Sequence, residues 1–118
     1  MEFSSKEDIE APIGEVFDLL SEFESFERSA IRRGVEVQRV DASAPNAAGL
    51  AWDTVFMVRG KPREMRLVLT KFERPGLMRF DSQSKGIKGV VLVELLALSP
   101  RRTRLNFDLT LSANTLTA

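Results

Sequence analysis

The sequence predicts an α+β fold in which a strongly curved antiparallel sheet of about seven strands follows the order β-α-α-β6. Two short helical patterns lie near the start of the chain, and apolar and polar residues alternate with a period of two after Gly34. The connections between the later strands are too short for crossover helices, which favours an antiparallel meander. With 118 residues, we expect the range 1–118 to form a single domain.

One strand and two helices are predicted before Gly34. Alternation over residues 3–9 predicts a weak first strand, and Pro12 ends it because proline lacks the backbone donor of a sheet ladder. A second helix is expected to begin near Ser21, which has capping-box spacing to Glu24, and to end at Gly34. The first helix is predicted by four apolar residues at helical spacing, namely Ile13, Val16, Phe17 and Leu20.

Six strands are predicted in the remainder of the chain, separated by turn-forming residues. The strand before Ser99 is apolar on both faces, and we assign the face opposite to Glu94 to the interior. Its inward residues are then Val91, Val93 and Leu95, and an outward apolar patch that could join two subunits of a homodimer consists of Val90, Leu92 and Leu96. The six strands are expected at residues 35–40, 50–58, 63–72, 77–84, 87–98 and 103–111.

The predicted sheet has more apolar surface than two short helices can cover, although such a face must be buried against another layer. Three solutions are open: the sheet curls strongly, a partner supplies the cover, or a third helix is missing. Residues 112–118 directly follow the last strand, where another element could begin. We therefore expect the chain to be truncated at its C-terminus.

The charges are distributed unevenly along the chain, although the net charge is zero. Residues 1–27 carry nine acidic and one basic side chain, a net charge of −8, and residues 28–118 carry eight acidic and sixteen basic ones, a net charge of +8. We expect the acidic segment to pack against a basic edge of the sheet. The alternative is a basic face for nucleic acid or an acidic partner. Because the arginines are dispersed and no surface aromatics lie between them, we expect no nucleic-acid partner.

The composition excludes several classes of site. Cys, His and Tyr are all absent, which removes thiolate nucleophiles, disulfides and thiolate or imidazole zinc ligands. We expect neither a metal nor a cofactor. The N-terminus lacks the pattern of a signal peptide, and no apolar run approaches the ~20 residues of a membrane-spanning helix, so we expect a cytoplasmic protein with no transmembrane segment.

Two stretches resemble the helix-grip superfamily, which includes START-related lipid-binding domains, polyketide cyclase/dehydrase-like (SRPBCC) proteins and birch-pollen-allergen-like proteins. The residues 9–13, Ile-Glu-Ala-Pro-Ile, with the apolar pairs at 16–17 and 19–20, are similar to its opening signature, and residues 99–105 resemble its final hairpin. The resemblance covers nearly the whole chain and implies a cavity between curved sheet and helices. The family carries a long C-terminal helix, and we expect this sequence to end before it; the absence of that helix would favour an open groove or a dimer.

The inward-facing side chains would line an apolar pocket suited to a hydrophobic small molecule such as a lipid, isoprenoid or polyketide-like aromatic. For each side chain the ordinary alternative is a place in the core. The resemblance favours Trp52 and Phe80, because it places their strands around the cavity. The predicted cavity residues are Trp52, Thr54, Phe56, Met65, Leu67, Leu69, Phe80, Ser82, Ser84, Val93, Leu105 and Phe107.

Catalytic candidates are few, and we assign no catalytic residue. Carboxylates fall mostly on the outward register, where a solvated side chain is the ordinary outcome. Glu64 is the best placed of them, since its strand begins at a turn that could lie near the mouth of the pocket. We expect a non-catalytic binding domain, with a polyketide cyclase/dehydrase-like enzyme and a chaperone-regulating or other protein-interaction module as alternatives. The carboxylates considered are Asp53, Glu64, Asp81, Glu94 and Asp108.

Overall fold

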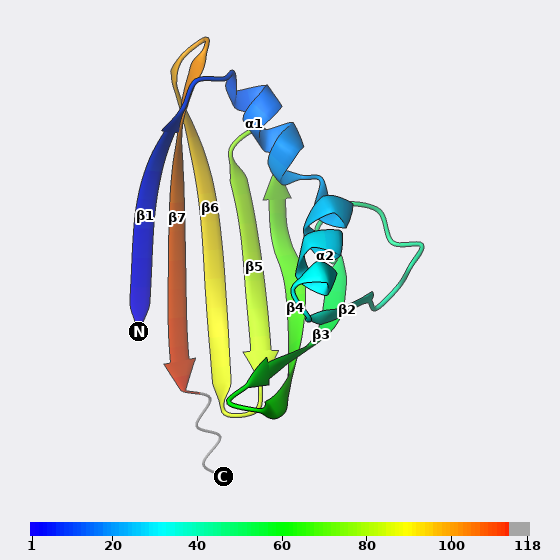
Figure 1. Ribbon diagram of the computed structural model, residues 1–118. Coiled ribbons are helices and arrows are strands. Elements are labelled where there is room, and N and C mark those ends of the chain that lie inside the picture. Colours follow the sequence, from blue (N-terminus) through cyan, green and yellow to red (C-terminus); the bar gives the residue numbers. More distant parts are fainter. Residues whose placement is uncertain (114–118) are drawn as a thin grey trace.

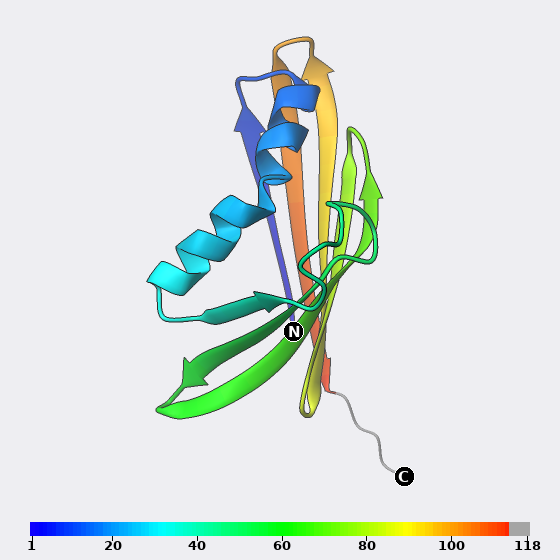
Figure 2. The same cartoon turned by 90° about the vertical axis from the view of Figure 1, so that its right-hand side faces the viewer.

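Residues 1–113 are described by the structure, a computed structural model, as one curved seven-stranded sheet with two helices on its concave side (Figures 1 and 2). The predicted order β-α-α-β6 is confirmed. The elements are β1 (Glu2–Ile9), α1 (Ile13–Leu20), α2 (Phe23–Arg32), β2 (Glu36–Arg39), β3 (Ala51–Val58), β4 (Lys61–Glu73), β5 (Leu77–Ser84), β6 (Ile87–Ser99) and β7 (Arg102–Ala113).

The strand order in the sheet is β1-β7-β6-β5-β4-β3-β2, and every neighbouring pair is antiparallel. The strands after α2 therefore form the predicted meander. The first strand closes onto the last, with Glu2 opposite Thr110 and Ile9 opposite Thr103. This arrangement makes β1 and β2 the two edges of the sheet.

Strong curvature is one of the three predicted solutions to the uncovered face, and it is the one seen in the described residues. The register between β4 and β5 shifts between Leu69 and Lys71, an irregularity of the kind that bends a strand. Figure 2 shows the β3–β4 hairpin curling round beneath α2. Two helices occur within residues 1–113. The expected truncation concerned residues 112–118, of which 114–118 lie outside the described residues.

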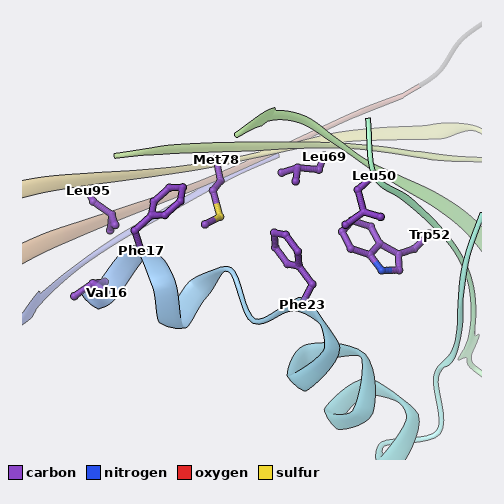
Figure 3. Packing of buried hydrophobic residues seen from close by; sticks show 8 residues of the cluster. All are labelled: Val16, Phe17, Phe23, Leu50, Trp52, Leu69, Met78 and Leu95. Carbon is purple, nitrogen blue, oxygen red and sulfur yellow. The ribbon is translucent and has the colours of Figure 1, made fainter. Parts of the chain in front are cut away.

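The hydrophobic core lies where the two helices face the middle of the sheet. Phe17 of α1 and Phe23 of α2 project onto it (Figure 3), with Phe17 lying 5.1 Å from Phe72 and Phe23 lying 5.5 Å from Trp52 between ring centroids. Aromatic pairs at such separations add about 0.5–1.5 kcal/mol each beyond the area they bury. The buried apolar residues are Val16, Phe17, Phe23, Leu50, Trp52, Leu69, Met78 and Leu95.

The predicted capping box at Ser21 is wrong. The Ser21 hydroxyl donates to the carbonyl of Phe17 at 2.7 Å, so it closes the end of α1, and no side chain caps the start of α2, whose N-cap residue is Glu22. The two helices follow each other so closely that Ser21 is already the C-cap of α1. Its hydroxyl therefore bonds to a carbonyl at the end of α1 and not to a backbone N–H at the start of α2.

Ion pairs join the acidic N-terminal segment to the later, basic part of the chain, as the charge distribution predicts. Asp8 pairs with Arg104 at 2.8 Å, and Glu27 pairs with Arg39 at 2.7 Å. Asp18 also pairs with Arg74 from the β4–β5 turn. The basic partners come from β2, from a turn and from β7, so the contact is spread over the sheet and is not confined to one edge.

The two apolar faces of β6 have different surroundings. Val93 faces the helices and Leu95 is buried, which confirms the inward assignment. On the outer face Leu96 is 55% exposed, whereas Val90 and Leu92 are half-buried. The exposed patch is therefore smaller than predicted, and the homodimer stays a prediction.

Candidate ligand-binding groove

An apolar groove of about 710 Å³ lies between α2 and the concave face of the sheet. It is continuous with the core, since Phe23, Trp52 and Met78 belong to both. The side chains that line it are Leu20, Phe23, Phe26, Glu27, Ala30, Val35, Val37, Trp52, Thr54, Phe56, Met65, Leu67, Met78, Phe80, Val91, Val93, Leu105 and Phe107.

Strand alternation and helix periodicity together position these side chains. On each strand the lining residues are two apart, as Trp52, Thr54 and Phe56 are on β3, because successive side chains point to opposite faces. The antiparallel register aligns them across the sheet, with Thr54 opposite Met65 on β4. One wall of the groove is thus the inner face of the sheet from β2 to β7, and α2 forms the other.

Most of the predicted cavity residues line this groove. Those that do are Trp52, Thr54, Phe56, Met65, Leu67, Phe80, Val93, Leu105 and Phe107. The other three point to the same face but do not reach the groove. Leu69 is fully buried in the core beneath the helices. Ser84 donates to the carbonyl of Glu64 at 2.8 Å, and Ser82 lies opposite Gly89, filling the space above that glycine.

Thr54 is the one predicted polar residue that lines the groove. Its hydroxyl donates to the backbone carbonyl of Met65 at 2.9 Å, so its single proton is already used within the sheet. The hydroxyl oxygen can accept a further hydrogen bond but cannot donate one. Thr54 can therefore orient a ligand only as a hydrogen-bond acceptor.

Sequence reasoning missed Glu27, a carboxylate in the wall of the groove. Its Oε2 atom accepts a hydrogen bond of 2.8 Å from the indole Nε1 of Trp52 and one of 2.7 Å from Nε of Arg39. A signal existed in the sequence, because Glu27 follows Phe23 by four residues and precedes Ala30 by three. Residues at these spacings share one face of a helix, so Glu27 belongs to the apolar, inward face of α2.

The predicted catalytic candidates do not gather in the groove. Asp53 forms a bidentate pair with Arg66 at 2.7 and 2.9 Å, and this hydrogen bonding lowers the pKa of Asp53 below its usual value. Glu64 lines a second hollow of about 700 Å³, together with Asp53 and Arg66, and this hollow shares Thr54 and Met65 with the groove. Glu64 itself does not line the groove, because its position on β4 places it on the outward register.

The other three carboxylates also lie apart from the groove. Asp81 pairs with Arg79 at 2.9 Å, Asp108 accepts from the Ser4 hydroxyl at 2.5 Å, and Glu94 is exposed. Within residues 1–113, acidic side chains do not gather in groups of three or more that could hold a metal ion. Neither helix of the described part has the length and apolar character needed to cross a membrane.

No family model and no curated protein matches the sequence. Solved structures do match. A point mutant of norcoclaurine synthase from Thalictrum flavum, in complex with a transition-state analogue, is similar with a TM-score of 0.75 at 8% identity, over 98% of this chain and 77% of that one. Ara h 8.0201 is similar with a TM-score of 0.70 at 10% identity, over 100% of this chain and 81% of that one.

An enzyme also appears among the similar structures: the Zhui aromatase/cyclase from Streptomyces sp. R1128 has a TM-score of 0.66 at 13% identity, over 98% of this chain and 69% of that one. Likeness at such low identity shows a shared fold. The predicted helix-grip architecture is thereby confirmed for this chain.

Proposed function

We propose that this protein binds a hydrophobic small molecule, such as a lipid, an isoprenoid or a polyketide-like compound, in the groove between α2 and the sheet, without transforming it. The observation that carries the proposal is the groove itself. Its volume of about 710 Å³ lies within the range of roughly 300–1,000 Å³ typical of small-molecule sites. Its lining is apolar and aromatic apart from Glu27 and Thr54.

The main alternative is an enzyme of the cyclase kind, in which Glu27 would act as a general base. The neighbours of this carboxylate argue against that role. Both Arg39 and Trp52 donate to the same oxygen of Glu27, Oε2, so protein donors already occupy that oxygen. Among the described residues that line the groove, Glu27 also lacks a second ionisable side chain beside it that could return a proton to the substrate.

Binding can be tested with N-phenyl-1-naphthylamine, a neutral probe whose fluorescence rises in apolar surroundings. The blocking variant is Ala30→Phe, which adds a ring on the groove side of α2. The control is Ser25→Phe, which adds the same ring at an exposed position of that helix. We expect saturable binding by the wild type, binding at least tenfold weaker by Ala30→Phe, and no change in Ser25→Phe.

Two results would contradict the proposal: a wild-type protein that does not bind the probe, or an Ala30→Phe variant that binds it as tightly as the wild type. Circular dichroism checks that both variants keep the wild-type fold. Native mass spectrometry of freshly purified protein adds an independent observation, because a natural ligand that is retained would appear as a discrete mass increment.

A further inference from the structure

Glu27 is the one charged side chain among the described residues that line the groove. It is also well shielded, with 20% of its side chain exposed. A carboxylate in an apolar wall loses hydration, and that loss is offset here by two hydrogen bonds from protein donors. The groove therefore contains a fixed negative group among apolar surfaces.

The two oxygens of this carboxylate have different surroundings. Both protein hydrogen bonds end on Oε2, from Trp52 at 2.8 Å and from Arg39 at 2.7 Å. Within residues 1–113, no hydrogen bond is made to Oε1. An ionised carboxylate has about four acceptor sites, so Oε1 can accept hydrogen bonds from a molecule bound in the groove.

The charge of the cluster favours a neutral donor. Arg39, whose side chain is 15% exposed, already balances the charge of Glu27. A ligand ammonium would bring a second positive charge into an apolar site, and a ligand carboxylate would face Glu27 directly. Arg39 does not itself line the groove, so its guanidinium does not receive an anion there. A neutral hydroxyl group adds no charge and donates the hydrogen bond that Oε1 lacks.

We propose that Oε1 of Glu27 is the polar anchor of the groove, and that the bound molecule is a neutral, largely apolar alcohol or phenol whose hydroxyl donates to this oxygen. This inference rests on the proposed ligand-binding function. In this arrangement Arg39 and Trp52 are positioning residues, because they hold the carboxylate through Oε2 and leave Oε1 directed to the ligand. Phe56, Leu105 and Phe107 are among the side chains that contact its apolar body.

The test compares four competitors that share a straight ten-carbon chain and differ in their polar group: 1-decanol, 1-methoxydecane, decanoate and decylamine. Each displaces N-phenyl-1-naphthylamine from the wild type, from Glu27→Gln and from Glu24→Gln. Glu24 is the matched control because it lies on the exposed side of α2, outside the groove. Methoxydecane is the informative comparison, since it keeps the oxygen and loses the donated proton.

We expect the wild type and Glu24→Gln to bind decanol about tenfold more tightly than the other three competitors, because hydrogen bonds to charged groups contribute more than neutral ones. In Glu27→Gln the preference for decanol over methoxydecane should fall below about threefold, because the acceptor is then neutral. Since this variant leaves Arg39 unbalanced, the double variant Glu27→Gln/Arg39→Met restores neutrality. It should show the same loss of preference and retain the wild-type circular dichroism spectrum.

Equal affinity of the wild type for decanol and methoxydecane overturns the anchor and leaves the proposed function standing. So does a double variant that keeps the full preference for decanol. If the wild type binds neither the fluorescent probe nor any competitor, the proposed function fails and the anchor fails with it.

Discussion

Phe17 and Phe26 provide a direct test of the boundary between core and groove, because they are the same residue type on neighbouring helices. Phe17 is 1% exposed and packs on the Phe72 ring, with the guanidinium of Arg74 lying 4.9 Å from its own ring centroid. Phe26 is 53% exposed and lines the groove. We expect Phe17→Ala to reduce stability and Phe26→Ala to weaken ligand binding.

The magnitudes follow from these exposures. Removing a fully buried phenylalanine costs about 3–5 kcal/mol through lost transfer free energy and the cavity left behind. About half of the Phe26 surface is exposed to water in the folded protein. Its truncation should therefore cost roughly 1 kcal/mol, half of the free energy gained by burying a phenylalanine side chain completely. In a domain of this size, Phe17→Ala should lower the melting temperature by roughly 10–20 °C.

Urea denaturation measures the free energy of unfolding of both variants, with the fluorescence of Trp52 as the reporter. Trp52 is the single tryptophan of the chain and is 4% exposed in the folded state, so unfolding moves it into water. Titration with N-phenyl-1-naphthylamine then compares binding by folded protein. The reasoning is refuted if Phe17→Ala loses less free energy of unfolding than Phe26→Ala, or if Phe26→Ala binds the probe as tightly as the wild type.

Three further changes test the sheet. Gly89→Val should lower the free energy of unfolding by about 1–3 kcal/mol in a urea melt, because a Cβ at this position would lie 2.6 Å from the Ser82 hydroxyl. A variant as stable as the wild type would show that this site is not crowded. Thr103→Val should lose about 1–3 kcal/mol, because a fully buried hydroxyl no longer donates to the Ala11 carbonyl at 2.8 Å, and an unchanged midpoint would contradict this. Hydrogen bonding to Arg104 lowers the pKa of Asp8 below 3.8. The free energy of unfolding of the wild type should therefore exceed that of Asp8→Asn by its full amount at neutral pH, and this difference should disappear as the pH falls below about 4. A difference that persisted at pH 2 in urea melts would exclude the Asp8–Arg104 pair as its cause.

Local patterns were sufficient to predict the elements of this fold. The alternation around Leu105 and Phe107 predicts both the strand β7 and its inner face, because one sheet face is buried and side chains have a period of two. Val16 and Phe17 likewise lie on the buried side of α1. Such predictions depend only on neighbours along the chain, and that information is fully present in a sequence.

The division of the inner face into core and groove could not be predicted in this way. Leu67 and Leu69 are two residues apart on β4 and point to the same side, yet Leu67 lines the groove and Leu69 is fully buried. The difference depends on where α1 and α2 cross the sheet, which is a tertiary property. The role of Glu27 was hidden for a related reason, since its donors Arg39 and Trp52 come from two other elements.

The pairing of β1 with β7 has a consequence for how the chain acquires its fold. Glu2 and Thr110 are opposite each other in the sheet although 107 residues separate them in the sequence. A ribosome extending this chain releases β1 long before its hydrogen-bonding neighbour exists, so the first strand stays unpaired through most of synthesis. Ladders of this kind close slowly, because a large loop must lose its freedom before any contact compensates for it. We therefore expect the β2–β6 meander to assemble early and the β1–β7 ladder to be the last part of the sheet to form.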